Sequence, residues 1–222
     1  MKVLQEGPLA NLLNRLMDLI LLNVLWFVCC LPVFTIGAAT CGLYEVTMRY
    51  ALYESPPVMS TFFQAFRKHF KNATHLTFLF LAMGIFLAAD LWCAFQWKSS
   101  IQFLIFVVIL AVGYFYLALL SHVFPVLTYF PIGVKESVKK GFFLSMSNGI
   151  FTIFIMVLNL IPVFLILLFP VYFGQILFFY FIVGFSVIAY LSSLHLIRLF
   201  DPVRAKEAEE LEEEQRRLRG QK

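Results

Sequence analysis

One uncharged stretch, residues 22–44, reads LNVLWFVCCLPVFTIGAATCGLY and combines an apolar helical run, a proline and a series of small residues. The chain carries no charge between Asp18 and Glu45, so this part is apolar enough to cross the roughly 30 Å of hydrocarbon in a bilayer. Pro32 interrupts the first helix, and Gly37 begins a second one whose small residues let another backbone approach closely in lipid. The stretch therefore predicts a helical hairpin in a membrane.

The composition of the whole chain agrees with this prediction. Of its 222 residues, 61% are hydrophobic and 14% are charged. Soluble domains are only roughly 45–50% apolar, so the chain is an all-α polytopic membrane protein by composition. Charges concentrate near the C-terminus, and we expect a membrane helical domain over residues 1–200 and a charged cytosolic tail over residues 201–222.

Apolar runs and breakers divide the membrane domain into about six transmembrane helices. Their expected ranges are about 12–34, 37–52, 73–97, 101–124, 149–169 and 174–199. Two interfacial helical segments, 60–72 and 134–148, are expected on the cytosolic side. Pro125 is expected to end the fourth transmembrane helix, and Asp201 and Pro202 to begin a new helix in the tail.

The basic residues predict the orientation. If the N-terminus is cytosolic and six helices cross, only Lys98 of the 17 Lys and Arg residues lies outside, which leaves sixteen inside. This is a strong positive-inside bias. We expect a multi-pass protein of the bacterial cell membrane with both termini in the cytosol, and turns outside that are too short to form a recognition surface.

Five polar or charged residues are the candidate intramembrane polar or packing positions: Asn23, Glu45, Arg49, Asp90 and Asn159. Charges within a membrane are costly and often functional. Because Glu45 and Arg49 are four residues apart on one helix, they can neutralise each other, and a structural or interfacial pair is favoured. A transporter would instead need Asn23, Glu45, Asp90 and Asn159 to line one cavity.

The segment 60–72 has an aromatic face and a basic face at helical spacing. Such a helix lies in the lipid headgroups, or it docks a partner. The candidate lipid- or partner-docking residues are Phe62, Phe63, Phe66, Phe70, Arg67, Lys68 and Lys71, together with Lys139 and Lys140 of the second interfacial segment.

Enzyme chemistry is not predicted. The sequence has no HExxH, no GxSxG and no glycine-rich phosphate loop, and its four histidines are scattered. We expect no catalytic residues, no metal site, no cofactor and no nucleic-acid partner. The four cysteines are expected to pack as small hydrophobic residues, and a disulfide between Cys41 and Cys93 stays open.

The runs DLILLN at 18–23 and LPVFTIGAAT at 31–40 strongly resemble the signature of the YesL-like family of small, uncharacterised bacterial membrane proteins. Residues 62–74 and 124–140 resemble two further blocks of that family. Its members are typically encoded beside carbohydrate ABC importer components and polysaccharide-degrading enzymes in Gram-positive bacteria. The resemblance implies an accessory role in sugar uptake and assigns no site residues.

Three functions follow as hypotheses. The first is a non-enzymatic accessory component of a carbohydrate ABC uptake system, whose partners are the lipid bilayer and the permease subunits. The second is an independent transporter or channel for small solutes. The third is a membrane sensor that acts through the cytosolic tail. The substrate, the identity of the partner and the oligomeric state are not encoded in any pattern of the sequence.

Overall fold

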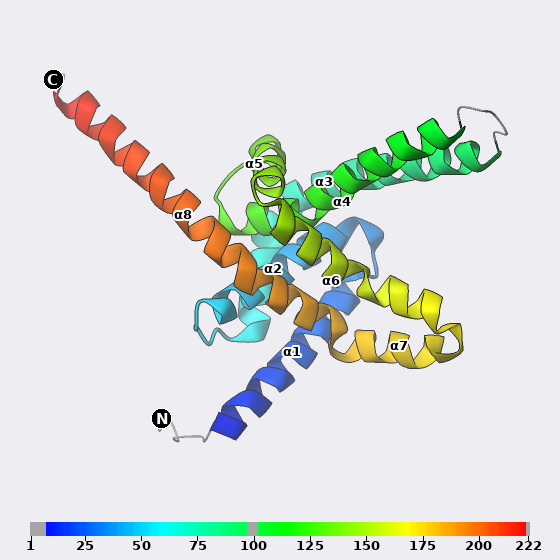
Figure 1. The fold of residues 1–222 in the computed structure, drawn as a ribbon. Helices are drawn as coiled ribbons and strands as arrows, with labels where there is room; N and C mark the ends of the chain where they lie inside the picture. The colour runs from blue at the N-terminus through cyan, green and yellow to red at the C-terminus, as the bar shows by residue number, and fades with distance from the viewer. Residues whose placement is uncertain (1–7, 97–101, 221–222) are drawn as a thin grey trace.

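The computed structural model describes residues 8–96 and 102–220, and within these ranges the chain consists of helices joined by short links, with no strand. The helices are α1 (Pro8–Cys30), α2 (Ile36–Ala51), α3 (Val58–Gln96), α4 (Gln102–Tyr129), α5 (Val134–Ser147), α6 (Gly149–Leu168), α7 (Phe173–Phe179) and α8 (Phe185–Gly220). Two 3-10 turns, Val33–Thr35 and Pro170–Tyr172, and a π-helical turn, Tyr180–Gly184, complete the order (Figure 1). The predicted all-α class is confirmed.

Helix α2 lies at the centre of the molecule (Figure 1). It packs against α1, α3, α4 and α8, and eleven of its 16 residues are buried. The small side chains predicted to form a packing face do so, because a Cβ atom added at Gly42 would come within 2.8 Å of the Phe62 ring on α3. The second half of the uncharged stretch is therefore the core around which the other helices pack.

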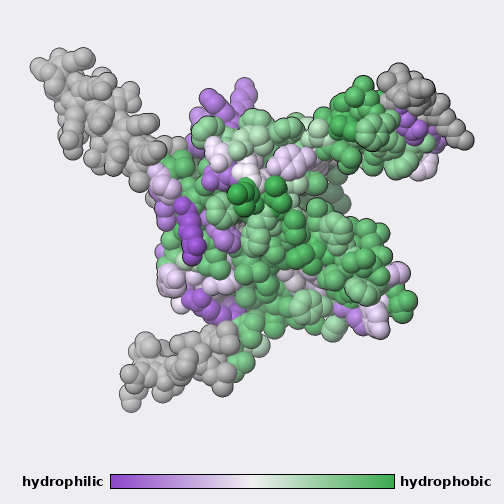
Figure 2. All heavy atoms as spheres, viewed as in Figure 1, coloured by the Kyte–Doolittle hydropathy of each residue, from purple (hydrophilic) through white to green (hydrophobic). Residues whose placement is uncertain are grey.

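The described chain has five helical stretches long and apolar enough to cross a membrane: Leu13–Cys30, Val58–Gln96, Gln102–Tyr129, Gly149–Leu168 and Pro170–Val203. Large apolar side chains stand exposed on them, such as Phe103 at 79% and Ile150 at 85%. Contiguous exposed apolar surface of this kind, visible over α6 and α7 in Figure 2, suits lipid rather than water. The chain is a polytopic membrane protein.

The sixth predicted crossing depends on α2. Its 16 residues span about 24 Å at ~1.5 Å per residue, which is less than the roughly 30 Å of a hydrocarbon core. Non-helical backbone beyond the ends of a short helix is tolerated at membrane depth where protein surrounds it, and α2 packs against four other helices. In Figure 1, α1 begins at the lower left and α8 ends at the upper left.

Three expected breaks are absent from the structure. Residues 60–72 are not a separate interfacial helix but the first third of the continuous helix α3, because no Gly or Pro occurs between Val58 and Met83. Pro125 lies inside α4, and Pro202 lies inside α8. Each proline removes one backbone donor without ending its helix. At Pro125 the flanking residues are buried, so tertiary packing holds these turns in place. The new helix expected at Asp201 does not form, and the division at residue 200 stays a prediction.

Candidate functional site

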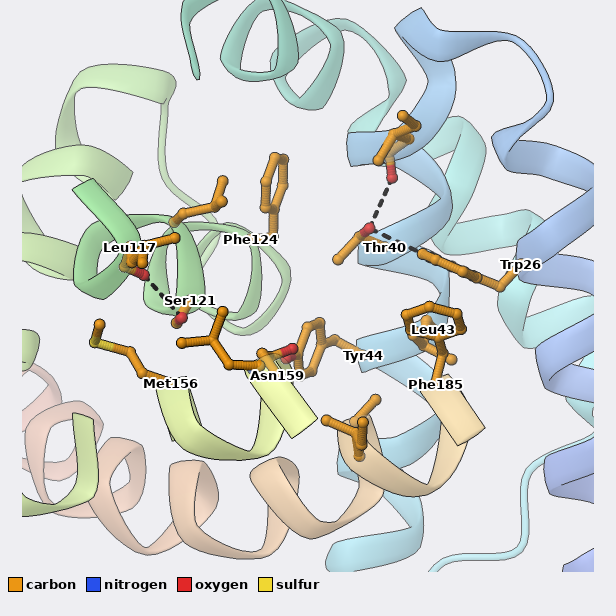
Figure 3. A pocket seen from close by; sticks show the side chains of 15 residues that line it. Trp26, Thr40, Leu43, Tyr44, Leu117, Ser121, Phe124, Met156, Asn159 and Phe185 are labelled. Atoms are coloured by element: carbon orange, nitrogen blue, oxygen red, sulfur yellow. Dashed lines mark hydrogen bonds between the residues drawn. The ribbon is translucent and has the colours of Figure 1, made fainter. Parts of the chain in front are cut away.

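The main candidate site is a cavity of about 350 Å³ beside α2 (Figure 3). Five helices form its wall: α1, α2, α4, α6 and α8. The lining residues are Trp26, Ile36, Thr40, Leu43, Tyr44, Leu117, Leu120, Ser121, Phe124, Met156, Asn159, Leu160, Phe185, Ile188 and Ala189. Within the described chain, none of these fifteen side chains is acidic or basic, so the site suits an uncharged occupant.

Few polar atoms line the cavity, and most already have a partner. The Thr40 hydroxyl donates to the Ile36 carbonyl at 2.7 Å and accepts from the Trp26 indole N–H at 3.3 Å. The Ser121 hydroxyl donates to a carbonyl one turn earlier on α4, at 2.8 Å. Asn159 donates one amide hydrogen to the Ile155 carbonyl at 2.8 Å. Its second N–H and its side-chain oxygen have no partner among the described residues.

The remaining wall is aliphatic and aromatic. The Trp26 and Phe185 rings pack with their centroids 4.6 Å apart and join α1 to α8 at this wall. An empty apolar space of about 350 Å³ is unfavourable, because its lining side chains lack packing partners on that side. Water fills such a space poorly, because each molecule needs two to four polar partners. The composition matches ligand pockets, which are mostly apolar with a few polar groups.

Asn23 lies outside this cavity and is fully buried between α1 and the π-helical turn. Its amide nitrogen donates to the carbonyls of Tyr180 and Phe181, at 2.9 and 2.6 Å. Its side-chain oxygen accepts from the backbone N–H of Ser186 at 2.9 Å. A π-helical turn shifts the register of the backbone hydrogen bonds. The Asn23 side chain forms hydrogen bonds with the backbone groups affected by this shift. Asn23 is therefore a packing position.

The two predicted charged positions on α2 meet as their spacing predicts. The Arg49 guanidinium donates two hydrogen bonds to one Glu45 carboxylate oxygen, Nε at 2.9 Å and Nη2 at 2.8 Å. A second carboxylate, that of Glu54, lies 3.9 Å from Arg49 Nη1. Both members of the Glu45–Arg49 pair are partly exposed, so the pair is a local ion pair rather than a buried charge site.

Asp90 lines a separate hollow with Cys93 and Ala94 on α3 and four apolar residues of α4. Of the four residues that a transporter would need in one cavity, the central cavity contains only Asn159. The structure therefore does not bring these four positions together. Cys41 is buried in α2 and Cys93 is exposed on α3, and both thiols are free.

The aromatic face of residues 60–72 is largely used inside the chain. Phe62 is fully buried against Gly42, while Phe66 and Phe70 are half-buried and pack toward α4 and α5. Only Phe63 keeps an exposed ring, at 36%. A face predicted to meet lipid or a partner therefore packs mainly on α2, α4 and α5 instead.

The basic face of the same segment points outward. Arg67, Lys68 and Lys71 are exposed on α3, and Lys139 is exposed on α5, which contacts α3. Lys140 is half-buried, with its ammonium 4.4 Å from the centre of the Phe130 ring. We name the exposed side chains Arg67, Lys68, Lys71 and Lys139 the basic inner surface, after the cytosolic side on which the sequence predicts them.

Sequence reasoning missed most of the cavity. Thr40 and Ser121 are ordinary hydroxyl residues in apolar helices, and nothing in their spacing separates them from hydroxyls that only bond their own helix. Asn159 was the one detectable signal, because an amide in the middle of an apolar run is unusual.

Comparison with known proteins finds relatives of this multi-pass helical membrane protein. The family model described as "Protein of unknown function, DUF624" matches residues 19–91, from α1 through α2 into α3. The uncharacterised protein YesL of Bacillus subtilis is 30% identical over 159 residues, which cover 68% of this chain and 75% of YesL. The uncharacterised protein YteU of the same organism is 25% identical over 172 residues, 74% of this chain and 77% of YteU. No solved structure matches.

The chain belongs to the YesL-like family of uncharacterised membrane proteins. The predicted membership is confirmed. The matched range contains the uncharged stretch, the Glu45–Arg49 pair and three of the four members of the basic inner surface.

Proposed function

We propose that this protein is a non-enzymatic accessory component of a carbohydrate ABC uptake system in the cell membrane. The basic inner surface is the observation that carries the proposal. A helix that floats on lipid presents its aromatic face to the bilayer, whereas here Phe62 is fully buried in the chain's own core. Arg67, Lys68 and Lys71 therefore stand on a helix fixed by internal packing, at defined positions relative to α5.

A fixed set of like charges suits recognition of a protein partner with acidic residues. Electrostatic complementarity chooses the partner and its register, and it needs charges at defined positions. The family resemblance suggests the identity of that partner, since members of the YesL-like family are typically encoded beside carbohydrate importer components. The importer's permease subunits at the inner membrane surface are the partner we propose.

A membrane sensor is the second candidate, and α8 favours it. This helix contributes Phe185, Ile188 and Ala189 to the wall of the central cavity and continues without a break to Gly220. A change at the cavity wall would thus reach the C-terminal end through one rigid element. The independent transporter has less support, because its four polar positions are not gathered in one place.

Charge reversal at the basic inner surface tests the proposed function. We expect Lys68→Glu combined with Lys71→Glu to reduce recovery of importer permeases about tenfold or more in a mild-detergent purification from the native host, since one defined charge pair contributes on the order of 1.4 kcal/mol. The matched control is Lys135→Glu combined with Arg198→Glu, which changes the net charge equally at other exposed positions.

Three results of this comparison are informative. Selective loss in the Lys68 and Lys71 pair, with equal amounts of both variants in the membrane, supports docking. An equal loss in both pairs would reduce the basic inner surface to a general electrostatic contact with anionic lipid. Absence of permeases from the unmodified protein's eluate would contradict the accessory role itself.

A further inference from the structure

We propose that the central cavity is a binding site for one uncharged amphiphile taken up from the bilayer, with an apolar chain and a single hydroxyl or carbonyl group. This inference is independent of the proposed function. Eleven of the fifteen lining residues are Ala, Leu, Ile, Met, Phe or Trp, and the polar remainder is Thr40, Tyr44, Ser121 and Asn159. The lining therefore suits the hydrocarbon chain of a ligand and offers few groups that can bond to the ligand's polar end.

The polar end of the ligand belongs near Asn159 and Ser121. Asn159 offers both a donor and an acceptor, because only one of its amide hydrogens is used within α6. The Ser121 hydroxyl already donates its hydrogen to a carbonyl of α4, so its oxygen can only accept a hydrogen bond from the ligand. Figure 3 shows Ser121 across the cavity from Thr40 and Trp26. A ligand hydroxyl can donate to either oxygen and accept from the Asn159 amide.

Charged and strongly hydrated ligands do not fit this chemistry. A charged group that is buried without a counter-charge incurs the full free-energy cost of desolvation. None of the lining residues carries a charge that could offset this cost. A sugar would leave most of its hydroxyls unpaired against Leu117, Leu120 and Leu160. The structure thus favours a lipid-like molecule over the solute of an importer.

We infer the bilayer as the source, because two of the lining residues are exposed on helices that are expected to stand in lipid. Ile36 at the rim is 36% exposed, and Asn159 is also exposed on α6. The neighbouring α6 side chains Ile153 and Val157, at 52% and 51% exposure, form the apolar outer surface expected to contact lipid chains. An amphiphile dissolved in the membrane reaches this rim without crossing water.

Photolabelling with a diazirine-tagged hexadecanol tests the site on the full-length protein in detergent micelles. We expect labelled peptides to come from the cavity walls on α2, α4, α6 and α8, and labelling to saturate. Unlabelled hexadecanol should displace the probe, whereas maltose and hexadecyl sulfate should not. Displacement by maltose would assign the cavity to a sugar and overturn the proposal, as would labelling that never saturates.

Two pairs of variants locate the ligand. Leu160→Trp fills the cavity and should lower probe incorporation about tenfold, whereas Val157→Trp adds the same ring to the exposed face of α6 and should leave it unchanged. Asn159→Leu should weaken binding about tenfold through its lost hydrogen bonds, and Val157→Leu should not. Equal labelling of Leu160→Trp and Val157→Trp, with both variants monodisperse, would refute a site in this cavity.

Discussion

Asn23→Leu will destabilise the protein by about 3 kcal/mol or more, because it removes the hydrogen bonds that a fully buried side chain makes to three backbone groups. These groups are the Tyr180 and Phe181 carbonyls and the Ser186 N–H, all bonded to the Asn23 amide. Leucine has the same number and branching of side-chain heavy atoms as asparagine, so the substitution leaves no void at this position. The measurement is the free energy of unfolding in detergent, by denaturant titration followed through tryptophan fluorescence.

Asn159→Leu is the matched control, since the same substitution there removes a single bond to a carbonyl of its own helix. We expect a change within about 0.5 kcal/mol, as for most substitutions away from a buried network. Hydrogen exchange at residues 180–186 should accelerate only in Asn23→Leu. Similar destabilisation in both variants would contradict a special role for Asn23 at the π-helical turn.

Gly37→Ala will destabilise by about 2–3 kcal/mol, because overpacking a tight helix contact forces backbones apart. An added Cβ would lie 2.6 Å from the Phe124 ring and 2.7 Å from the Ala73 carbonyl oxygen. A backbone carbonyl cannot move aside as the end of a flexible side chain can. The Gly37 N–H also donates to the Thr77 hydroxyl at 3.1 Å, so separating α2 from α3 would weaken that bond too.

Gly113→Ala is expected to change the stability in the opposite direction. A Cβ atom there meets nothing within 4 Å, so the better helix propensity of alanine should stabilise the protein by up to about 1 kcal/mol. The sign of the change in unfolding free energy thus distinguishes the two effects: close packing makes Gly37→Ala destabilising, and helix propensity makes Gly113→Ala stabilising. Two changes of the same sign would show that α2 and α3 are not held in this close contact.

Patterns local in the sequence predicted the parts of the fold that depend on local physics. The helical hairpin, the small packing face of α2 and the Glu45–Arg49 pair all follow from spacing within one or two turns. The all-α membrane class follows from composition. None of these predictions needs to know which distant helices meet.

The predictions that were wrong depend on contacts between residues that are distant in the sequence. Helical periodicity placed Phe62, Phe66 and Phe70 on one face, but it could not say that Gly42 leaves room for Phe62 and turns that face inward. In the same way, Asn23 bonds residues more than 150 positions away, at a π-helical turn that has no local signature.

Two further predictions could not be compared with the structure. The outer turn with Lys98 lies outside the described residues. The side chains of the tail beyond Val203 lie outside them as well, although α8 itself continues to Gly220.

We predict that α2 crosses the membrane as the buried half of the hairpin, so that the chain crosses six times and both termini lie in the cytosol. Single cysteines at Val33 and Ser55, exposed positions on either side of α2, test it most directly in a variant without the four native cysteines. In intact cells, a membrane-impermeant maleimide should label Val33→Cys, and it should label Ser55→Cys only after permeabilisation. Labelling of both positions from the same side would contradict the account.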